Sequence, residues 1–211
     1  MLKAVLLDFD GTLVTEDILD VMCDLVGKRA ESAVINEAFH RGEKPGLSGL
    51  LDRINLLQGL SLSQIHDKLS ENSFLMPGAR QLCSSLRENN IVTILASGNI
   101  LPILQFYQQE LDLSYIIGVA PVVRDGILQK ITLDDMPQKD FKLEESKKIL
   151  EKVGVQPYEV AAIGDSIADK SMFLFAGTAI AINPKHGIEE YADYTITNLH
   201  EAIPILEKQL H

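Results

Sequence analysis

Short, almost continuous apolar runs alternate along the chain with longer stretches of helical periodicity, and this alternation limits the fold more than any other feature. The predicted strands are Ala4–Leu7, Ile91–Ala96, Tyr115–Val119, Val160–Ile163, Ala179–Ile182 and Tyr194–Ile196. The predicted helices are Ala79–Glu88, Ile100–Leu111, Leu143–Val153, Lys170–Ala176 and Leu199–Lys208. Apolar strands that alternate with helices are typical of a parallel sheet covered on both faces. We therefore predict an α/β fold with a doubly wound, Rossmann-like core, whose ligands bind beyond the carboxyl ends of the strands.

The region between the first predicted strand and residue 75 breaks this alternation. It contains no strand pattern but several amphipathic helical stretches, among them Ile18–Val26 and Gly49–Leu57. We interpret residues 15–75 as a small α-helical cap domain. On this interpretation the cap is inserted into an α/β core domain formed by residues 1–14 and 76–211.

A second interruption lies between the third and fourth predicted strands. Pro121–Ile131 begins and ends with extended apolar runs, and Arg124-Asp125-Gly126 lies between them. An Asp-Gly pair between two extended runs is typical of a β-hairpin. We therefore predict a small β-excursion from the core at this point.

The overall charge excludes two classes of partner. The chain has 211 residues and carries 30 Asp and Glu against 19 Lys and Arg, a formal net charge of −11. Nucleic acids and anionic membrane surfaces are bound through an excess of Lys and Arg, so neither is an expected partner. An anionic small molecule is compatible with this charge, because a site can be locally positive within an acidic protein. The sequence does not indicate an oligomeric state.

Three features favour a cytoplasmic protein. No apolar run reaches the length of about eighteen residues that a transmembrane helix requires. The first eleven residues have too short an apolar stretch, and the wrong continuation, for a signal peptide. Cys23 and Cys83 both fall in helix-like patterns, so we expect free thiols that serve as packing groups in a reducing compartment.

The first predicted strand ends in two carboxylates and a turn, in the stretch DFDGT. Asp8 and Asp10 flank one aromatic residue, and Gly11-Thr12 follow directly. A strand that ends in a solvated Asp-Gly turn would explain this pattern without any chemistry. Two carboxylates at the carboxyl end of a buried strand would also suit a metal or a reaction centre.

Two further segments offer groups that could hold an anion. In the stretch ASGN, Ser97 and Gly98 follow the second predicted strand, where a hydroxyl and free backbone N–H groups at a helix start could bind a phosphate. Alternatively, Ser97 is simply a helix N-cap. Lys142 lies just before the periodic pattern of a predicted helix, and by itself it is an ordinary surface lysine.

The fourth segment, IGDSIADK, supplies two more carboxylates after the fourth predicted strand. Asp165 and Asp169 are four residues apart, so both side chains could face the same way, and Gly164 permits a sharp turn. A capping aspartate and a second one in the first helical turn would explain either acid alone. They would not explain why this strand end resembles the end of the first strand.

Together these four segments contain the parts of a phosphoryl-transfer site. Two strand ends supply carboxylate oxygens, the ligand type that Mg²⁺ prefers while it keeps room for water and a substrate phosphate. A serine hydroxyl, backbone amides and a lysine supply the positive and hydrogen-bonding side of a phosphate site. Phosphoryl transfer requires such positioning, together with neutralisation of the charge on the phosphate oxygens.

The motifs DFDGT, SGN, Lys142 and GDSIAD, in this order, resemble those of the haloacid dehalogenase superfamily of phosphotransferases, in its phosphoserine-phosphatase-like branch. The resemblance covers nearly the whole chain. The separation between Lys142 and Asp165 and the helical insertion after DFDGT are similar too.

The resemblance implies a role for each acid. Asp8 would be the nucleophile that forms an aspartyl-phosphate intermediate. Asp10 would protonate the leaving alcohol and then activate water. Asp8 and Asp165 would bind Mg²⁺ through their side chains and Asp10 through its backbone carbonyl, which leaves the Asp10 side chain able to carry a proton.

It also implies the groups that surround these acids. Ser97, the Gly98 amide and Lys142 would hold the phosphoryl group, and Asp169 would orient Lys142 or a metal-bound water. Dehalogenases do not need the second acid of DFDGT, so Asp10 favours phosphate ester chemistry.

Asp17, Arg53 and Asn99 bear on substrate choice, and Asn99 and Ala168 could alter orientation or rate. Asp17 stands where phosphoserine phosphatases carry a Glu for the substrate amine, and Arg53 falls where they carry an Arg for the substrate carboxylate. Alternatively, Arg53 is an exposed residue of an amphipathic helix. Asn99 stands where those enzymes often have a second Gly, and Ala168 where they often have Asn.

We therefore predict a Mg²⁺-dependent phosphomonoesterase for a small phosphorylated metabolite, phosphoserine or a close analogue. One alternative is a phosphatase for another small substrate, such as phosphoethanolamine, phosphocholine or a sugar phosphate. A sugar phosphomutase is a weaker alternative, because its intermediate would have to survive long enough to return the phosphate. Another is a catalytically weak, phosphate-binding regulatory protein, although such a protein is expected to lose at least one costly site charge.

Overall fold

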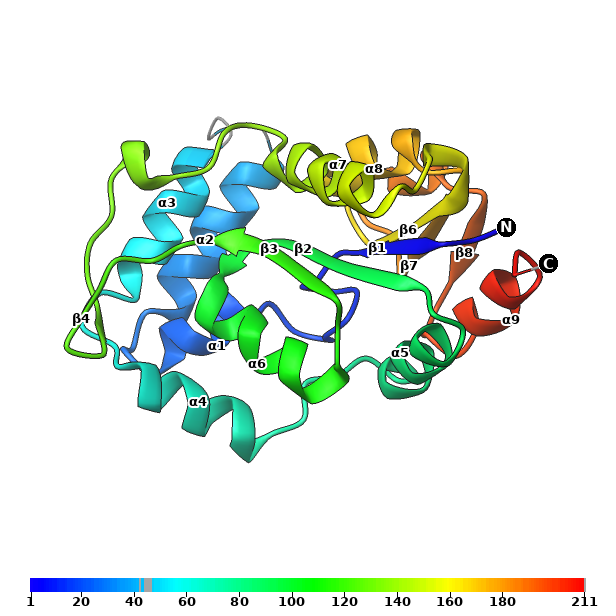
Figure 1. Ribbon diagram of the computed structural model, residues 1–211. Helices are drawn as coiled ribbons and strands as arrows, with labels where there is room; N and C mark the ends of the chain where they lie inside the picture. Colours follow the sequence, from blue (N-terminus) through cyan, green and yellow to red (C-terminus); the bar gives the residue numbers. More distant parts are fainter. Residues whose placement is uncertain (42, 44–46, 211) are drawn as a thin grey trace.

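A six-stranded parallel sheet forms the centre of the protein (Figure 1). The computed structural model describes residues 1–41, 43 and 47–210. The strand order is β3-β2-β1-β6-β7-β8, so β1 lies in the interior and pairs with β2 and β6. This arrangement confirms the predicted doubly wound α/β core. The strands are β1 (Ala4–Leu7), β2 (Val92–Ile100), β3 (Tyr115–Val119), β6 (Val160–Gly164), β7 (Thr178–Ile182) and β8 (Tyr194–Ile196).

Helices cover both faces of the sheet, as the apolar strands require. Side chains alternate across β1, so Val5 and Leu7 pack into one core cluster and Ala4 and Leu6 into the other. Burial of each large apolar side chain contributes about 1.5–3 kcal/mol. No helix within the described residues is both long and apolar enough to cross a membrane. On one face lie α5 (Ala79–Glu88), α6 (Leu101–Leu111) and α9 (Ala202–Glu207), and on the other α7 (Phe141–Val153) and α8 (Lys170–Phe175).

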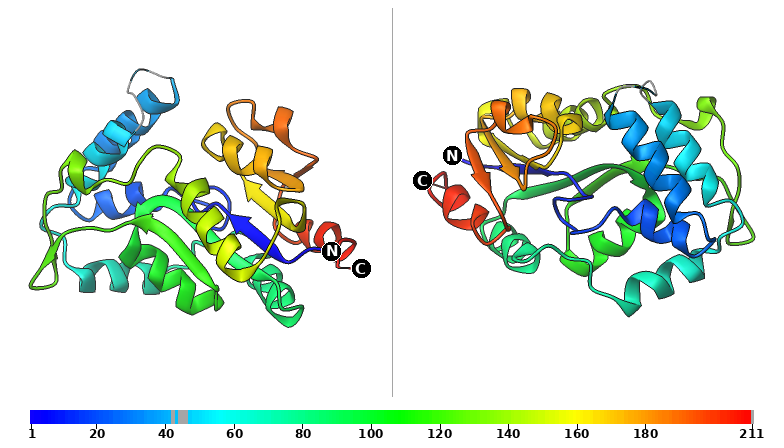
Figure 2. Two further views of the ribbon diagram at one scale, coloured as in Figure 1. Left: turned by 45° about the horizontal axis from the view of Figure 1, so that its top comes forward. Right: turned by 180° about the vertical axis from the view of Figure 1, so that it is seen from behind.

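Within the described residues, the segment predicted as a cap forms four helices that lie to one side of the sheet, at the left of Figure 1 and again together in both views of Figure 2. They are α1 (Ile18–Asp24), α2 (Arg29–His40), α3 (Leu47–Leu56) and α4 (Leu62–Glu71). The chain leaves and re-enters the core side by side, because Val14 bridges to Leu75 and the Met76 amide donates to the Leu13 carbonyl at 2.9 Å. The division into a core and a cap domain stays a prediction.

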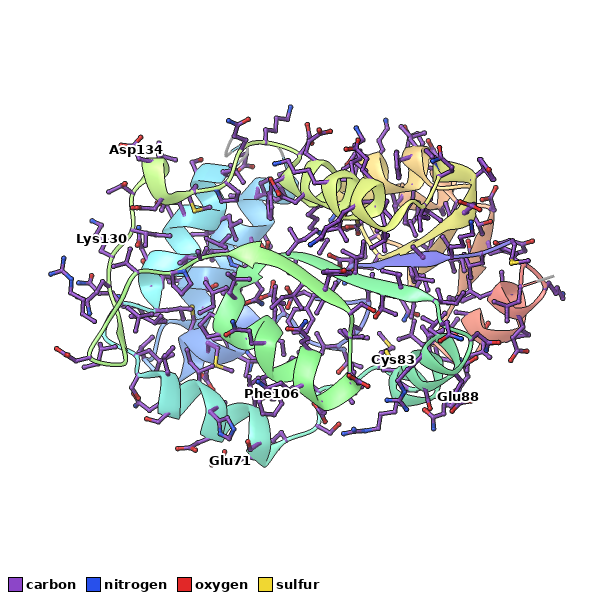
Figure 3. The ribbon with its side chains drawn as sticks, in the orientation of Figure 1. Glu71, Cys83, Glu88, Phe106, Lys130 and Asp134 are labelled. Carbon is purple, nitrogen blue, oxygen red and sulfur yellow. The ribbon has the colours of Figure 1, made fainter. Side chains whose placement is uncertain are left out.

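The predicted hairpin is present as β4 (Val123–Arg124) and β5 (Ile127–Leu128). Asp125 and Gly126 have φ angles of 50° and 75°, the left-handed values that tight hairpin turns need. The hairpin packs against the inserted helices rather than the sheet, and the Gly59 and Leu128 amides form hydrogen bonds across that contact. Figure 3 labels Lys130 and Asp134 on the same excursion, beside α3.

The main difference from the sequence prediction concerns the end of the second strand. The sequence predicts a strand that ends at Ala96, with the SGN segment at the start of a helix. Instead β2 continues to Ile100, with an irregularity in its pairing to β3 after Ala96, and α6 begins at Leu101. The SGN segment is therefore extended chain at the carboxyl end of β2. Short 3₁₀ helices complete the fold at η1 (Leu133–Asp135), η2 (Pro157–Glu159), η3 (Ile167–Asp169) and η4 (Ile188–Tyr191).

The two cysteines are free and buried, as predicted. Cys83 lies on α5 (Figure 3), and burial raises the pKa of its thiol to about 12. A thiol with so high a pKa stays protonated and unreactive, so Cys83 acts as an apolar packing group.

Candidate active site

Three buried carboxylates meet at the carboxyl ends of two neighbouring strands. Asp8 follows β1, Asp165 follows β6, and Asp169 ends the 3₁₀ helix η3. One oxygen of each lies within 4.8 Å of one oxygen of the other two. The Asp8 amide donates to the Ile163 carbonyl of β6 at 2.9 Å, which holds the two strand ends side by side.

Two glycines make this close approach possible. Gly11 has a φ of 84°, and a Cβ atom there would lie 2.2 Å from Asp165 Oδ2. A Cβ atom at Gly164 would lie 2.6 Å from Asp169 Oδ2. Any larger residue at either position would displace a carboxylate of the cluster, so the glycines after the strands serve the site as well as the turns.

Lys142, in the first turn of α7, joins two of the three acids. Its Nζ donates to Asp8 Oδ1 at 2.6 Å and to Asp169 Oδ1 at 3.0 Å. Burial alone would lower the pKa of Lys142, but the carboxylates of Asp169 and Asp8 outweigh it and raise that pKa. Lys142 is therefore a fixed positive charge beside Asp8 and no ordinary surface lysine.

Asp169 differs from the other two acids in how fully its oxygens are occupied. Its Oδ2 accepts from the backbone amides of Asp165 and Ser166 at 3.2 and 3.3 Å, and its Oδ1 accepts from Lys142. Within the described residues no hydrogen bond reaches Asp8 Oδ2 or Asp165 Oδ1. The open oxygens therefore belong to Asp8 and Asp165.

A second lysine, which the sequence reasoning missed, contacts the cluster. Lys185 Nζ donates to Asp165 Oδ2 at 2.9 Å, and its backbone amide donates to the Asp165 carbonyl at 2.8 Å. Lys185 lies in the loop after β7, at the same edge of the sheet as the acids. A search of every predicted strand end for charged residues would have found it.

The residues of the cluster fit a divalent cation. Three carboxylates face the ammonium groups of two lysines, so one negative charge is left without a counter-charge. Burial and the nearby Asp169 carboxylate raise the pKa of Asp8 well above its usual range, so the ionised form of Asp8 is disfavoured by the cluster itself. Open carboxylate oxygens on Asp8 and Asp165 are the ligands that a hard cation prefers.

Asp10 lies outside the cluster and has different partners. Its Oδ1 accepts from the Ile18 amide at 2.8 Å, and the Asn99 Nδ2 lies 3.4 and 3.3 Å from Oδ1 and Oδ2. Burial, with the nearby Asp17 carboxylate, raises the pKa of Asp10 to about 7, against the hydrogen bond from Ile18. A carboxyl with this pKa can both donate and accept a proton near neutral pH.

The SGN segment at the end of β2 faces the same space. Ser97 is buried, and its Oγ accepts from the Asn99 amide at 3.0 Å, which leaves the hydroxyl proton free to donate. A Cβ atom on Gly98 would lie 3.0 Å from a methyl carbon of Leu50, a residue of α3. The inserted helices thus come into direct contact with the segment predicted to hold phosphate.

Asp17 and Arg53, the two predicted substrate contacts from the inserted helices, lie against each other. Arg53 Nη2 donates to Asp17 Oδ1 at 2.5 Å and to Asp20 Oδ1 at 2.9 Å, and Arg53 Nε donates to Ser32 Oγ at 2.9 Å. Asp17 Oδ2 also accepts from the Asn36 side chain at 3.2 Å. The Arg53 side chain is 8% exposed, so it is a buried, ion-paired residue.

One cleft of about 510 Å³ brings these groups together. Of the predicted residues it is lined by Asp8, Asp10, Asp17, Arg53, Ser97, Gly98, Lys142, Asp165 and Ala168. Asn99 and Asp169 are buried and lie behind this lining. The cleft has its acids and lysines at the sheet edge and the Asp17–Arg53 pair on the inserted helices.

Comparison with known proteins agrees with this arrangement. Residues 5–174 match the family described as haloacid dehalogenase-like hydrolase. A probable phosphoserine phosphatase of Schizosaccharomyces pombe is 30% identical over 99% of this chain and 69% of its own length. A phosphoserine phosphatase of Albidiferax ferrireducens is 29% identical over 92% of this chain and 84% of its own length.

Comparison of the fold with solved structures points to the same group of proteins. A solved phospho-aspartyl intermediate analogue of phosphoserine phosphatase superposes with a TM-score of 0.83 at 26% identity, and covers 97% of this chain and 98% of its own. The chain belongs to the haloacid dehalogenase-like hydrolases, in their phosphoserine phosphatase branch.

Proposed function

We propose that the protein is a phosphomonoesterase that transfers the phosphoryl group of a small metabolite to Asp8 and then to water. The contact between Lys142 Nζ and Asp8 Oδ1, at 2.6 Å, is the observation that carries this proposal. A permanent positive charge in this position would meet the anionic phosphoryl group beside the proposed nucleophile, which supports the proposal. Transfer of that group requires such charge neutralisation.

In the first step a carboxylate oxygen of Asp8 attacks phosphorus. The bond between phosphorus and the ester oxygen breaks, and that oxygen takes the proton of Asp10 as it leaves as an alcohol. Ser97, the Gly98 amide and Lys142 hold the phosphoryl oxygens during the transfer. The product of this step is an acyl phosphate on Asp8.

In the second step a water molecule attacks the phosphorus of the intermediate. Asp10, now ionised, takes a proton from this water, the bond to Asp8 breaks, and inorganic phosphate leaves. Asp10 is suited to both directions of proton transfer because its pKa of about 7 lies near neutral pH.

Asp8 and Asp165, together with the Asp10 backbone carbonyl, are the groups we propose to hold Mg²⁺. The bound ion would supply a positive charge for the phosphoryl oxygens and keep Asp8 ionised. Asp169 has both oxygens occupied by Lys142 and by backbone amides, which supports a role in orienting Lys142.

The Asp17–Arg53 pair supports phosphoserine as the substrate. A zwitterionic head group could exchange with an existing ion pair, its ammonium against Asp17 and its carboxylate against Arg53. The named relatives are phosphoserine phosphatases, which agrees with this assignment. Arg53 would keep Asp20 as a partner throughout.

One observation favours a second substrate, phosphoethanolamine. Arg53 already contacts two carboxylates, Asp17 and Asp20, so its charge is compensated before any substrate binds. A substrate with an ammonium group and no carboxylate would leave these contacts intact and use only the acidic side of the pair.

The first experiment measures phosphate release from p-nitrophenyl phosphate with Mg²⁺ and with EDTA, for the wild type and for Asp8→Asn. We expect metal-dependent turnover that Asp8→Asn abolishes. Turnover that survives in Asp8→Asn would contradict the proposed nucleophile, and no turnover at all would favour a phosphate-binding regulatory protein. Values of kcat/KM for L-phosphoserine and phosphoethanolamine, measured side by side, then decide between the two substrates.

A further inference from the structure

The Asp10 carboxyl is held by two donors from different parts of the chain. The Ile18 amide at the start of α1 contacts Oδ1 alone, at 2.8 Å. The Asn99 side chain, 89 residues away in sequence, reaches both oxygens, at 3.4 Å for Oδ1 and 3.3 Å for Oδ2. Within the described residues, Asn99 is therefore the side chain that hydrogen-bonds to Asp10 Oδ2.

The orientation of the Asn99 amide is fixed by its own partners. Asn99 is 1% exposed, and its Oδ1 accepts from the Ile100 amide at 2.9 Å. The flipped amide would point its NH₂ group at the Ile100 N–H and its oxygen at a carboxylate, which pairs donor with donor and acceptor with acceptor. The NH₂ group must therefore face Asp10.

The backbone around Asn99 is fixed as well, and it connects Asp10 to the phosphate site. The Asn99 amide donates to Ser97 Oγ at 3.0 Å, so one residue contacts both the predicted phosphate-binding serine and the predicted acid. Asn99 lies in the irregular end of β2, and from this position its side chain reaches Asp10.

We propose that Asn99 is a positioning residue that aims the Asp10 carboxyl at the leaving-group oxygen while Ser97 holds the phosphoryl group. This inference rests on the proposed function. The contacts to Asp10 are at the long end of the hydrogen-bond range, so Asn99 guides the carboxyl without locking it. The carboxyl stays free to give and take a proton.

The leaving group provides the test, because only a poor leaving group needs the proton of Asp10. Phenol has a pKa of about 10 and needs protonation, whereas p-nitrophenol is a much stronger acid and leaves as an anion. The two phosphate esters differ in one nitro group and so occupy the same cleft. Their kcat/KM values report the steps up to transfer of the phosphoryl group to Asp8.

We expect Asn99→Ala to lower kcat/KM for phenyl phosphate about ten- to hundredfold and to change that for p-nitrophenyl phosphate much less. Asp10→Asn should show the same selectivity with a loss of about 10²–10⁴ for phenyl phosphate. Adding Asn99→Ala to Asp10→Asn should cause no further loss, because the carboxyl that Asn99 positions is already absent.

Equal losses on both esters, or additive losses in the double variant, would overturn the proposal, because a merely structural residue would behave in that way. Asn99→Gly provides a second variant if Asn99→Ala fails to fold, and thermal unfolding checks both. A wild type that cleaves neither ester would overturn the proposed function itself. An active wild type with unselective variants would overturn only the role of Asn99.

Discussion

Arg53 and Asp17 form an ion pair inside the cleft, with Nη2 and Oδ1 2.5 Å apart and the arginine side chain 8% exposed. Asp20 shares the same guanidinium nitrogen at 2.9 Å. The pair therefore has two properties that can be measured separately, a contribution to stability and an influence on substrate choice.

The contribution to stability follows from burial. Arg53→Ala leaves Asp17 and Asp20 close together without a counter-charge, so the free energy of unfolding should fall by about 3–5 kcal/mol. Urea unfolding without added metal measures this change. Arg87→Ala is the matched control, because Arg87 is 54% exposed where it pairs with Asp112, and its loss should cost under about 1 kcal/mol. Equal effects of the two substitutions would contradict the ion-pair assignment.

The influence on substrate choice is tested at Asp20. Asp20→Asn keeps an oxygen for Arg53 but removes one negative charge, so the guanidinium should attract a substrate carboxylate more strongly. We expect the ratio of kcat/KM for L-phosphoserine over phosphoethanolamine to rise about fivefold. Asp24→Asn, an exposed acid at the end of the same helix, should leave the ratio unchanged. A ratio that does not respond to Asp20→Asn would show that Arg53 does not meet the substrate.

The raised pKa of Asp10 predicts a pH dependence of stability. The pKa is about 7 in the folded protein and 3.8 ordinarily, so the folded state holds this proton more tightly than the unfolded state. Stability is then lost as the pH rises from about 4 through 7. The side chain of the Asp10→Asn variant has no proton to lose in this range. The free energy of unfolding of Asp10→Asn, relative to that of the wild type, should therefore rise by about 2 kcal/mol between pH 5.5 and pH 8.

Urea unfolding in EDTA at the two pH values measures this difference. Asp134→Asn, at an exposed position, is the control and should show no such trend. A difference between Asp10→Asn and the wild type that is constant with pH would contradict the raised pKa.

We expect that the Tyr107 hydroxyl can be removed without loss of stability. Its hydroxyl is buried and has no hydrogen-bond partner among the described residues, while its ring packs edge-on against Phe9 at 5.0 Å. Tyr107→Phe keeps the ring and removes the unpaired hydroxyl, so stability should be unchanged or higher by up to about 1 kcal/mol. Thermal unfolding beside Tyr158→Phe, an exposed tyrosine, measures this change. A clear loss of stability in Tyr107→Phe would mean that the hydroxyl has a partner.

The sequence predicted the parts of the site that depend on strand ends. Asp8 and Asp165 follow apolar runs predicted as strands of one parallel sheet, so both were expected at the same end of the strands; that the two strands are neighbours is a finding of the structure. The role of Lys142 could be predicted only from the resemblance to a family, because nothing in the local sequence distinguishes it from the other lysines of its helix.

Contacts between segments that are distant in sequence could not be predicted in this way. The contact from Asn99 to Asp10 depends on an irregular strand end, and periodicity predicted a helix start instead. The docking of the hairpin on the inserted helices depends on backbone hydrogen bonds, which have no residue signature.

The docked hairpin joins the inserted helices to the core by a third route. The excursion that contains it leaves the sheet at the end of β3 and returns at the start of α7, one residue before Lys142. Backbone hydrogen bonds at Gly59, Leu60 and Leu62 fasten it to the helices. One continuous stretch of chain, residues 120–140, therefore connects the inserted helices to the first turn of α7, where Lys142 lies beside Asp8.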